Sequence, residues 1–286
     1  MKYIFSIIAL ISVLVSGTTF AKDLSTLEQI KKTETIRIGY RDNEPPMSFI
    51  NKDNQPVGYS IELCLHIVNE IKSTLKNPNI AVKYVPVTAT NRFESLADNS
   101  IDILCGSTTK TLSRSELVDF SELTFVTGAS FISLKTAEIE NLEGLAGKKV
   151  AVVKDTTTIA TLAKALKKID SDAEIIAVDS ATEGMKAVNS NKVDAFSSDQ
   201  IILIGLAITQ GDPKKYALAK ELFSYEPFAL AIRRNDSDFR LLTNRVLSGL
   251  YRSGKITETY SRWFGKYIKN VPSLLEAMYI LNSTAE

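Results

Sequence analysis

The chain has 286 residues, of which 44% are hydrophobic and 23% are charged. This ordinary globular composition excludes a disordered, collagen-like or multi-span membrane protein, and the length suits two modest domains or one large one. The formal net charge of +1 at pH 7 lacks the basic excess of nucleic-acid or membrane-surface binders, so we expect no nucleic-acid partner.

The first 21 residues have the pattern of a cleavable signal peptide. Lys2 supplies a positive charge, residues 4–15 are almost continuously apolar, and the small residues Thr19 and Ala21 flank an expected cut after Ala21. The apolar run is shorter than the roughly 20 residues of a spanning helix, and polar sequence follows at once, which disfavours an uncleaved anchor. We therefore expect a periplasmic protein, without a lipid anchor because no cysteine lies near the cut.

Strand and helix patterns alternate after the signal peptide. Residues 35–40 alternate like a strand, and residues 60–75 place Ile61, Leu65 and Val68 on one helical face. Alternating units at this spacing predict a largely parallel sheet covered by helices. The remaining members of this first series are expected as strands at 80–85 and 101–104 and a short helix at 91–98.

A second series of the same kind follows. Two extended segments bracket it, at 124–134 and 224–232, and we expect them to be hinge strands between two lobes. The expected fold class is therefore α/β, with two lobes that each contain a mostly parallel sheet flanked by helices. The second series has expected strands at 148–153, 174–178 and 193–197 and expected helices at 157–168, 181–189 and 200–209.

Helical patterns at 238–250 and 256–264 are expected to return to the first lobe, and an amphipathic stretch at 274–281 to pack outside a lobe. The predicted organisation is a signal peptide (1–21), a discontinuous lobe 1 (22–128 and 228–269), a lobe 2 (129–227) and a C-terminal tail (270–286).

The chain has two cysteines, Cys64 and Cys105, whose spacing matches no metal motif. Export permits a disulfide, but a helix position and a strand end leave their contact open, and we expect two buried free thiols. The single histidine, His66, lies in a helical pattern and is expected to be structural. Because no nucleophile–base pair or metal cluster is evident in the sequence, we expect no cofactor, no metal and no enzyme activity.

Ligands of open α/β sheets bind beyond the carboxyl ends of the strands, near helix N-termini, so residues that follow strands are the site candidates. Arg41 follows the first strand and its planar fork suits a carboxylate, although for this residue taken alone a surface arginine paired with Asp42 or Glu44 is the favoured interpretation. Arg92 falls in the first turn of a helix that Thr90 is expected to cap, where a cation opposes the helix dipole. That position indicates a role in binding an anion, and a solvated helix arginine stays open as the alternative.

Further candidates follow the other strands. Ser107 and Thr109 belong to a run of small hydroxyl residues that follows Gly106, where a ligand can approach the backbone, and Arg114 follows shortly. An ordinary polar turn is the alternative. Three threonines, at 156–158, precede a helix, whereas capping requires only one.

Asp199 lies at a strand exit and is suited either to an ammonium group or to capping the next helix. Taken together, two or three arginines, several hydroxyls and one carboxylate at one rim complement a small zwitterion that carries an extra negative charge.

Six short motifs strengthen this interpretation: Gly39-Tyr40-Arg41, Gly58-Tyr59-Ser60, Thr90-Asn91-Arg92, Cys105-Gly106-Ser107-Thr108-Thr109, Gly144-Leu145-Ala146-Gly147-Lys148 and Trp263-Phe264. Over roughly residues 24–267 the chain resembles the family 3 extracellular solute-binding proteins of polar amino acid ABC transporters, and it is most similar to their glutamate/aspartate-binding branch. The resemblance implies a type II periplasmic binding protein fold that closes over its ligand by a hinge.

The resemblance also implies residue roles. In the family, the arginine at the position of Arg92 binds the ligand α-carboxylate, and the residue at the position of Thr157 assists from the second lobe. In the acidic branch, the arginine at the position of Arg41 contacts the side-chain carboxylate. The chain departs from the acidic branch at two positions. That branch has histidine near the position of Ala181 and serine at the position of Ala89, where the neighbouring Thr90 can substitute for the serine hydroxyl. The positions expected to receive the α-ammonium group are Ser107, Thr109 and Asp199.

The resemblance therefore implies a monomeric periplasmic binding protein that captures glutamate or aspartate and delivers it to a membrane ABC permease. Two alternatives stay open: a binding protein for another polar amino acid, and a periplasmic dehydratase of the same fold. A detached sensor domain is disfavoured, because no catalytic or spanning segment follows in this sequence.

Overall fold

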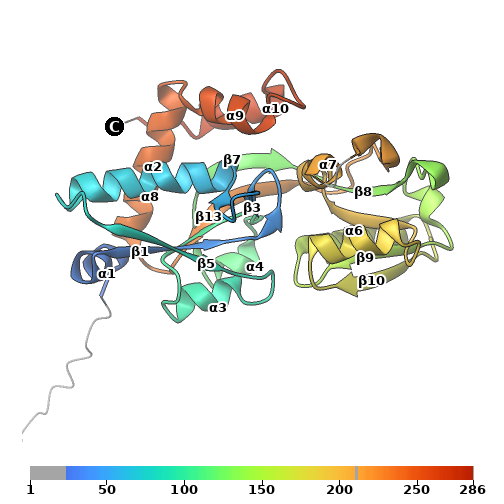
Figure 1. Cartoon of the computed structure of the whole chain (residues 1–286), viewed down its shortest axis with the longest axis horizontal. Helices are drawn as coiled ribbons and strands as arrows, with labels where there is room; N and C mark the ends of the chain where they lie inside the picture. The colour runs from blue at the N-terminus through green and yellow to red at the C-terminus, as the bar shows by residue number, and fades with distance from the viewer. Residues whose placement is uncertain (1–23, 210–211, 286) are drawn as a thin grey trace, which may run out of the picture.

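The structure is a computed structural model that describes residues 24–209 and 212–285. The expected signal peptide lies outside the described residues. Two lobes lie side by side along the long axis of the molecule, and each contains a five-stranded sheet with helices packed on it (Figure 1). The two-lobed α/β fold expected from the sequence is confirmed.

Lobe 1 is built from the first part of the chain together with segments that return near its end. Its main sheet has the order β5 (Ala81–Pro86), β1 (Thr35–Tyr40), β6 (Ile103–Cys105), β13 (Glu226–Ile232) and β7 (Asp119–Thr127). A small second sheet contains β2 (Asn43–Glu44), β3 (Ser48–Ile50) and β4 (Pro56–Val57). The helices are α1 (Thr26–Thr33), α2 (Tyr59–Thr74), α3 (Arg92–Ala97), α4 (Leu112–Ser115), α8 (Ser237–Arg252), α9 (Ile256–Phe264) and α10 (Ser273–Leu281).

Lobe 2 repeats this plan with a single stretch of chain. Its sheet has the order β10 (Glu174–Val178), β9 (Lys149–Val153), β11 (Ala195–Asp199), β8 (Ala129–Leu134) and β12 (Tyr216–Leu218). The helices are α5 (Thr157–Lys168), α6 (Ala181–Asn189) and α7 (Gln200–Thr209), with short 3₁₀ turns at Lys135–Ala137, Glu143–Leu145 and Pro213–Lys215.

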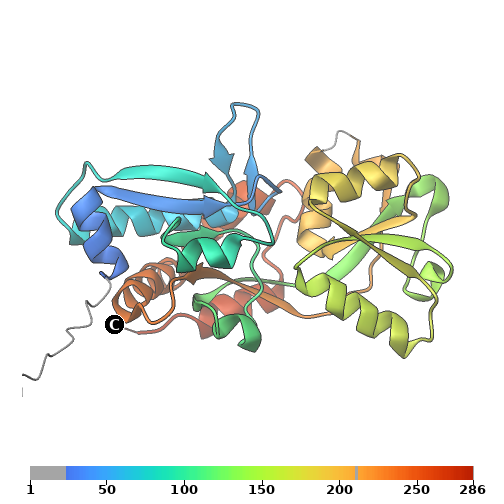
Figure 2. The same ribbon diagram turned by 90° about the horizontal axis from the view of Figure 1, so that it is seen from below.

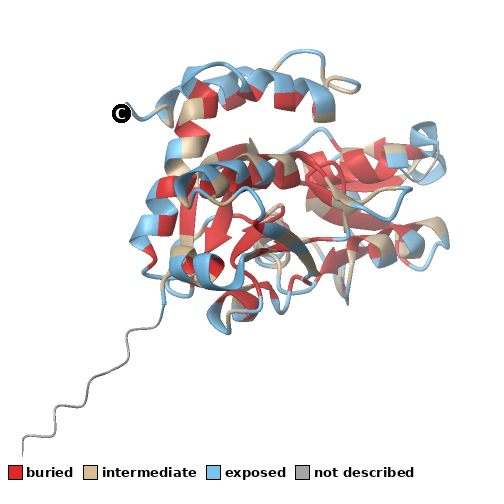
Figure 3. Ribbon diagram, turned by 60° about the vertical axis from the view of Figure 1, so that its left-hand side comes forward, coloured by how far each residue is buried: buried red, intermediate tan, exposed pale blue. Residues whose placement is uncertain are grey.

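In each main sheet three strands run parallel and two are antiparallel to their neighbours. The parallel strands β5, β1 and β6 of lobe 1 and β10, β9 and β11 of lobe 2 direct their carboxyl ends toward the space between the lobes (Figures 1 and 2). The buried residues follow the strands and the inner faces of the helices (Figure 3). One expected core position is wrong: Leu65 of α2 is 37% exposed, because the buried face turns through Ile61, Cys64, Val68 and Ile71 instead.

Two connections join the lobes, and they touch each other. Strand β7 of lobe 1 continues through Gly128 into β8 of lobe 2, and the chain returns through Ser224 into β13. A Cβ atom on Gly128 would lie only 2.4 Å from the Ser224 carbonyl oxygen, so only glycine fits where the connections cross. The backbone N–H of Ala129 donates to the Ser224 hydroxyl at 2.9 Å and joins them further.

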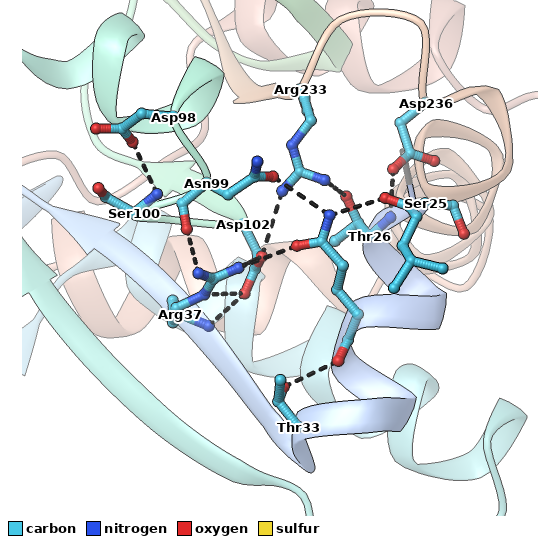
Figure 4. A network of polar contacts seen from close by, with 12 residues as sticks. Ser25, Thr26, Thr33, Arg37, Asp98, Asn99, Ser100, Asp102, Arg233 and Asp236 are labelled. Carbon is cyan, nitrogen blue, oxygen red and sulfur yellow. Dashed lines mark hydrogen bonds and ion pairs between the residues drawn. The ribbon is translucent and has the colours of Figure 1, made fainter. Parts of the chain in front are cut away.

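A buried polar network ties the returning chain to lobe 1 (Figure 4). The Asp102 carboxylate, fully buried, pairs with Arg37 of β1 at 2.5 Å and with Arg233, which follows β13, at 3.5 Å. The backbone N–H of Thr26 donates to the Asp236 carboxylate at 2.7 Å, which joins α1 to the start of α8 across 210 residues of sequence. Asp102 precedes β6, so this network lies at the amino ends of the parallel strands, away from the space between the lobes, and we interpret it as structural.

Helix α10 packs on lobe 1 against β7 and α8 through buried Leu275, Met278 and Tyr279. The hydroxyl groups of Tyr279 and Tyr59 are 2.9 Å apart, and Tyr59 donates to the Thr124 carbonyl oxygen of β7 at 2.8 Å. The C-terminal helix therefore supports the strand that leads out of lobe 1.

The expectation of two free thiols is wrong, because Cys64 of α2 and Cys105 of β6 form a disulfide with a Cα–Cα distance of 6.4 Å. The helix lies on the sheet with Cys64 directed at the end of β6, a proximity that neither sequence pattern contains. The bond fixes α2 to the strand that precedes Ser107 and Thr109.

Removing this disulfide is expected to destabilise the protein. The bond closes a loop with a sequence separation of 41 residues, for which chain entropy corresponds to about 4 kcal/mol. The double variant Cys64→Ala/Cys105→Ala is therefore expected to lose about 3 to 4 kcal/mol of unfolding free energy in urea titrations. A double variant with the same urea midpoint as the wild type would contradict this expectation. So would a wild type whose urea midpoint does not change when a reductant is added.

Candidate functional site

A polar pocket lies between the lobes, where the carboxyl ends of the parallel strands face one another. Seven of the eight side chains nominated from the sequence line this pocket: three from lobe 1 loops after β1 and β6, one each from α3 and α4, and two from lobe 2. They are Arg41, Arg92, Ser107, Thr109, Arg114, Thr157 and Asp199. Thr90 is not among its lining residues.

Arg92 is the first residue of α3, and its side chain turns back into the pocket, leaving the residue 3% exposed. Its guanidinium donates to the Ala89 carbonyl oxygen at 2.6 Å and, across the cleft, to the Asp155 carbonyl oxygen at 3.1 Å. Burial, followed by repulsion from Arg114 and Arg41, lowers the pKa of Arg92 to about 9. The protein therefore maintains a buried cation against desolvation and like charge, as expected of a group that awaits an anion.

Arg114 reaches the same pocket from α4. Its guanidinium donates to the Thr109 carbonyl oxygen at 2.9 Å, and burial lowers its pKa from the usual value. Phe93 lies beneath both guanidinium groups. The centroid of its ring is 4.7 Å from Cζ of Arg92 and 5.5 Å from Cζ of Arg114. This aromatic platform, which the sequence reading did not single out, holds two like charges side by side.

Arg41 follows β1, and its backbone N–H donates to the Ser48 hydroxyl at 2.9 Å. Its guanidinium forms an ion pair with Glu44 at 2.9 Å, and both side chains are nearly buried in the pocket. Ser107 donates to the other carboxylate oxygen of Glu44 at 2.5 Å. The pair with Glu44 considered as a surface alternative is therefore present, but inside the cleft.

A second carboxylate, Glu226, was missed by the sequence reading. It begins β13, is 1% exposed, and accepts hydrogen bonds from Thr109 at 2.7 Å and from Thr157 at 2.8 Å. Thr109 comes from lobe 1 and Thr157 from lobe 2, so Glu226 joins both lobes at the crossing. An acidic residue that begins an otherwise apolar strand was the available signal, but only residues that follow strands had been considered.

Asp199 ends β11 and enters the pocket from lobe 2. Among the residues that the structure describes, its Oδ1 atom is one of the few buried side-chain atoms without a hydrogen-bond partner. Burial, followed by repulsion from Glu226 and Glu44, raises the pKa of Asp199 well above its usual range. A cation placed against this carboxylate would relieve both penalties.

Thr90 has a different role from the one expected. The N-cap of α3 is Asn91, not Thr90, and the Thr90 hydroxyl donates across the cleft to the Asp155 carboxylate at 2.6 Å.

On another side of the cleft, a Cβ atom on Gly205 of α7 would lie 2.0 Å from the Pro45 carbonyl oxygen, so the helix packs closely on lobe 1. The small sheet stands out from lobe 1 beside lobe 2, where β2 contacts α6 and α7 (Figure 2). The lobes are thus in contact on several sides of the pocket.

The pocket is therefore lined by three guanidinium groups, two carboxylates and several hydroxyls, with the Glu226 carboxylate directly behind Thr109 and Thr157. Within residues 24–209 and 212–285, two other buried atoms of this pocket lack hydrogen-bond partners, Nε of Arg41 and Nε of Arg92. Unpaired donors next to an unpaired acceptor suit a small ligand that carries both carboxylate and ammonium groups. In the described part of the chain, no group of three or more His, Cys, Asp or Glu residues is arranged to hold a metal ion, and no helix is long and apolar enough to cross a membrane.

Comparison with known proteins agrees with this geometry. A two-lobed α/β fold with a polar cleft defines the class of periplasmic-type binding proteins, and solved structures of that class superpose on the chain. The cysteine-binding protein of Campylobacter jejuni has a TM-score of 0.75 and 25% identity over 87% of this chain and 97% of its own. An ancestral amino acid-binding protein, described as a precursor of cyclohexadienyl dehydratase, has a TM-score of 0.72 and 27% identity over 84% of this chain and 100% of its own.

The family follows from the sequence match. Residues 36–266 match the model of the bacterial extracellular solute-binding proteins, family 3, and the chain belongs to that family. Among curated proteins, the L-glutamate/L-aspartate-binding protein of Pseudomonas aeruginosa is 31% identical over 90% of this chain and 85% of its own length. The resemblance stated from the sequence motifs is confirmed at the level of the family and its amino acid-binding members.

Proposed function

We propose that this chain is the periplasmic substrate-binding component of an amino acid ABC transporter and that it captures glutamate or aspartate. The observation that carries the proposal is the set of three guanidinium groups in one cleft, those of the buried Arg41 and Arg92 and of the partly buried Arg114. The similarity to a relative named as a glutamate/aspartate-binding protein supports the same ligand class. The protein acts as a monomer that delivers the ligand to a membrane permease.

In this proposal the ligand's α-carboxylate binds Arg92, which carries an unpaired Nε beside the pocket. The α-ammonium group binds Asp199, whose Oδ1 lacks a hydrogen-bond partner among the described residues. Burial and the nearby carboxylates make the negative charge of Asp199 unfavourable until a cation binds it. The side-chain carboxylate binds near Arg41. A buried charge needs a partner of opposite sign. These three contacts provide one for each of the ligand's three charged groups, which offsets the cost of removing them from water.

Closure of the two lobes retains the ligand. Arg92 and Arg41 belong to lobe 1, whereas Asp199 and Thr157 belong to lobe 2, so the full set of contacts is available only when the lobes meet. The contacts of Thr90 and Arg92 with Asp155 form in the same arrangement. Ligand binding therefore shifts the population toward the closed form through contacts that the open form lacks.

Calorimetric titration tests the proposal. The protein without residues 1–21 is refolded to remove carried ligand and titrated with glutamate, aspartate, glutamine, asparagine and arginine. The expected result is micromolar or tighter binding of glutamate or aspartate, with weaker binding of the others. Incubation with candidate dehydratase substrates, with analysis of the products, accompanies the titration.

The outcomes separate the alternatives. Preference for a neutral or basic amino acid would retain the transport function and replace the ligand. Absence of binding for all five, or turnover of a dehydratase substrate, would overturn the proposal.

A further inference from the structure

We propose that Glu44 sets the selectivity of this cleft: by holding Arg41 in a buried ion pair, it limits the preference for ligands with a second carboxylate. The inference rests on the proposed function, because it concerns the side-chain end of the amino acid site. It assigns a specificity-determining role to a residue of the pocket that does not belong to the set nominated from the sequence.

The carboxylate of Glu44 is placed to compete for Arg41. One oxygen lies 2.9 Å from the Arg41 Nη1 atom, and the other accepts from the Ser107 hydroxyl at 2.5 Å. The side chains of Arg41 and Glu44 are only 7% and 11% exposed, so water screens the pair weakly. The guanidinium that would bind a side-chain carboxylate is thus already partly neutralised.

The charges of the whole pocket favour the same conclusion. The three arginines share the pocket with the lining carboxylates of Glu44 and Asp199, and Glu226 lies close behind them. Carboxylates therefore already oppose much of the arginine charge before a ligand binds. A dicarboxylic amino acid needs the Arg41 charge for its second carboxylate, and Glu44 already pairs with that charge. Glutamine has nearly the shape of glutamate but does not need this charge, so the pair lowers the affinity for glutamate more than that for glutamine.

The loop that carries Glu44 is held mainly by other contacts. Arg41 N–H donates to the Ser48 hydroxyl at 2.9 Å, Met47 N–H to the Glu44 carbonyl oxygen at 2.9 Å, and Tyr59 N–H to the Pro46 carbonyl oxygen at 2.9 Å. None of these bonds involves the Glu44 side chain. The backbone of this loop is therefore held without the Glu44 side chain. Because the Glu44 carboxylate is buried and lines the pocket, we assign it a role in ligand selectivity.

The test is a double-mutant cycle on ligand selectivity. Dissociation constants for glutamate and glutamine are measured by calorimetry for the wild type, Glu44→Gln, Arg41→Gln and the double variant. We expect the glutamine-to-glutamate ratio of Kd to rise by at least about tenfold in Glu44→Gln. In the Arg41→Gln background the same change is expected to alter the ratio less than about twofold, because Glu44 acts through Arg41.

The matched control is Glu94→Gln, which removes an exposed negative charge from α3, the helix that carries Arg92. Its ratio is expected to stay that of the wild type. An unchanged or lower ratio in Glu44→Gln, an equal rise in Glu94→Gln, or an equal rise without Arg41 would each overturn the inference.

Two further results keep the test decisive. Thermal unfolding followed by circular dichroism checks that Glu44→Gln is folded, and Glu44→Ser carries the same expectation if the glutamine variant is not. A wild type that binds neither amino acid overturns the proposed function together with this inference, whereas binding with an unchanged ratio in the variants overturns the inference alone.

Discussion

Replacing Arg92 by methionine is expected to weaken amino acid binding by about 3 kcal/mol, or roughly 150-fold in Kd. Methionine fills much of the volume of the aliphatic stem but leaves the ligand α-carboxylate without its buried partner. The loss is expected for every amino acid that binds, because the α-carboxylate is common to all of them. Calorimetric titration of the variant with the best ligand measures it.

The same variant is expected to be more stable than the wild type when no ligand is bound. Burial and the like charges of Arg114 and Arg41 oppose the Arg92 charge and lower its pKa to about 9, so removing the cation relieves an unfavourable interaction. A gain in unfolding temperature combined with a loss of binding would identify a residue retained for function rather than stability.

The control for this variant is Arg240→Met. It removes an arginine from the surface of α8, where the side chain is 44% exposed and lies 3.6 Å from Asp119. Affinity in this control should match the wild type. An Arg92→Met protein that keeps wild-type affinity would show that the α-carboxylate binds elsewhere.

Replacing Asp199 by asparagine is the second change with a large expected effect. Asparagine keeps the shape but cannot neutralise an ammonium group, so affinity for the amino acid is expected to fall by about 2 to 3 kcal/mol, roughly 30- to 150-fold. Unliganded protein is expected to be stabilised at neutral pH, because the Asp199 charge is buried near Glu226 and Glu44.

The pH dependence of this stabilisation has a definite sign. Asp199 has a raised pKa in the folded protein, so the folded state binds more protons than the unfolded chain between about pH 4 and the raised value. The contribution of Asp199 to the free energy of unfolding therefore decreases as pH rises through this window. The stability advantage of Asp199→Asn over the wild type should be small near pH 4 and should grow toward pH 7.

Urea titrations at several pH values measure this advantage, with Asp53→Asn as the control. Asp53 lies exposed in the turn between β3 and β4, so its replacement should leave a difference from the wild type that does not grow with pH. A stability advantage of Asp199→Asn that is independent of pH, or a loss of stability at pH 7, would contradict the assigned environment.

The elements that the sequence predicted best are those with strong local patterns. Helices α5, α6, α7 and α9 and strands β1 and β10 have the bounds expected from periodicity, since an apolar face that repeats every 3.6 or 2 residues is a property of the segment itself. The short elements α1, α4, β12 and the small sheet were missed, because their few residues carry little periodic signal.

The errors share a physical origin in packing between segments. Leu65 was placed in the core because it is apolar and suitably spaced, but the sheet meets the neighbouring face of α2. Cys64 and Cys105 are joined because that face lies on the end of β6, which neither segment encodes alone. Thr90 was assigned to capping, whereas a partner 65 residues away accepts its hydrogen bond.

Local patterns in the sequence were enough to predict the α/β class, the two-lobed order, the family and most of the nominated side chains that line the pocket. These depend on local periodicity and on the rule that strand ends carry ligand sites. The folded structure was needed to find that Glu44 pairs with Arg41 inside the pocket, that Glu226 joins the lobes at their crossing, and that Asp155 accepts the Thr90 hydrogen bond. Such pairings depend on distances between segments far apart in the chain, and the electrostatic balance of the cleft depends on those distances and on burial rather than on residue type.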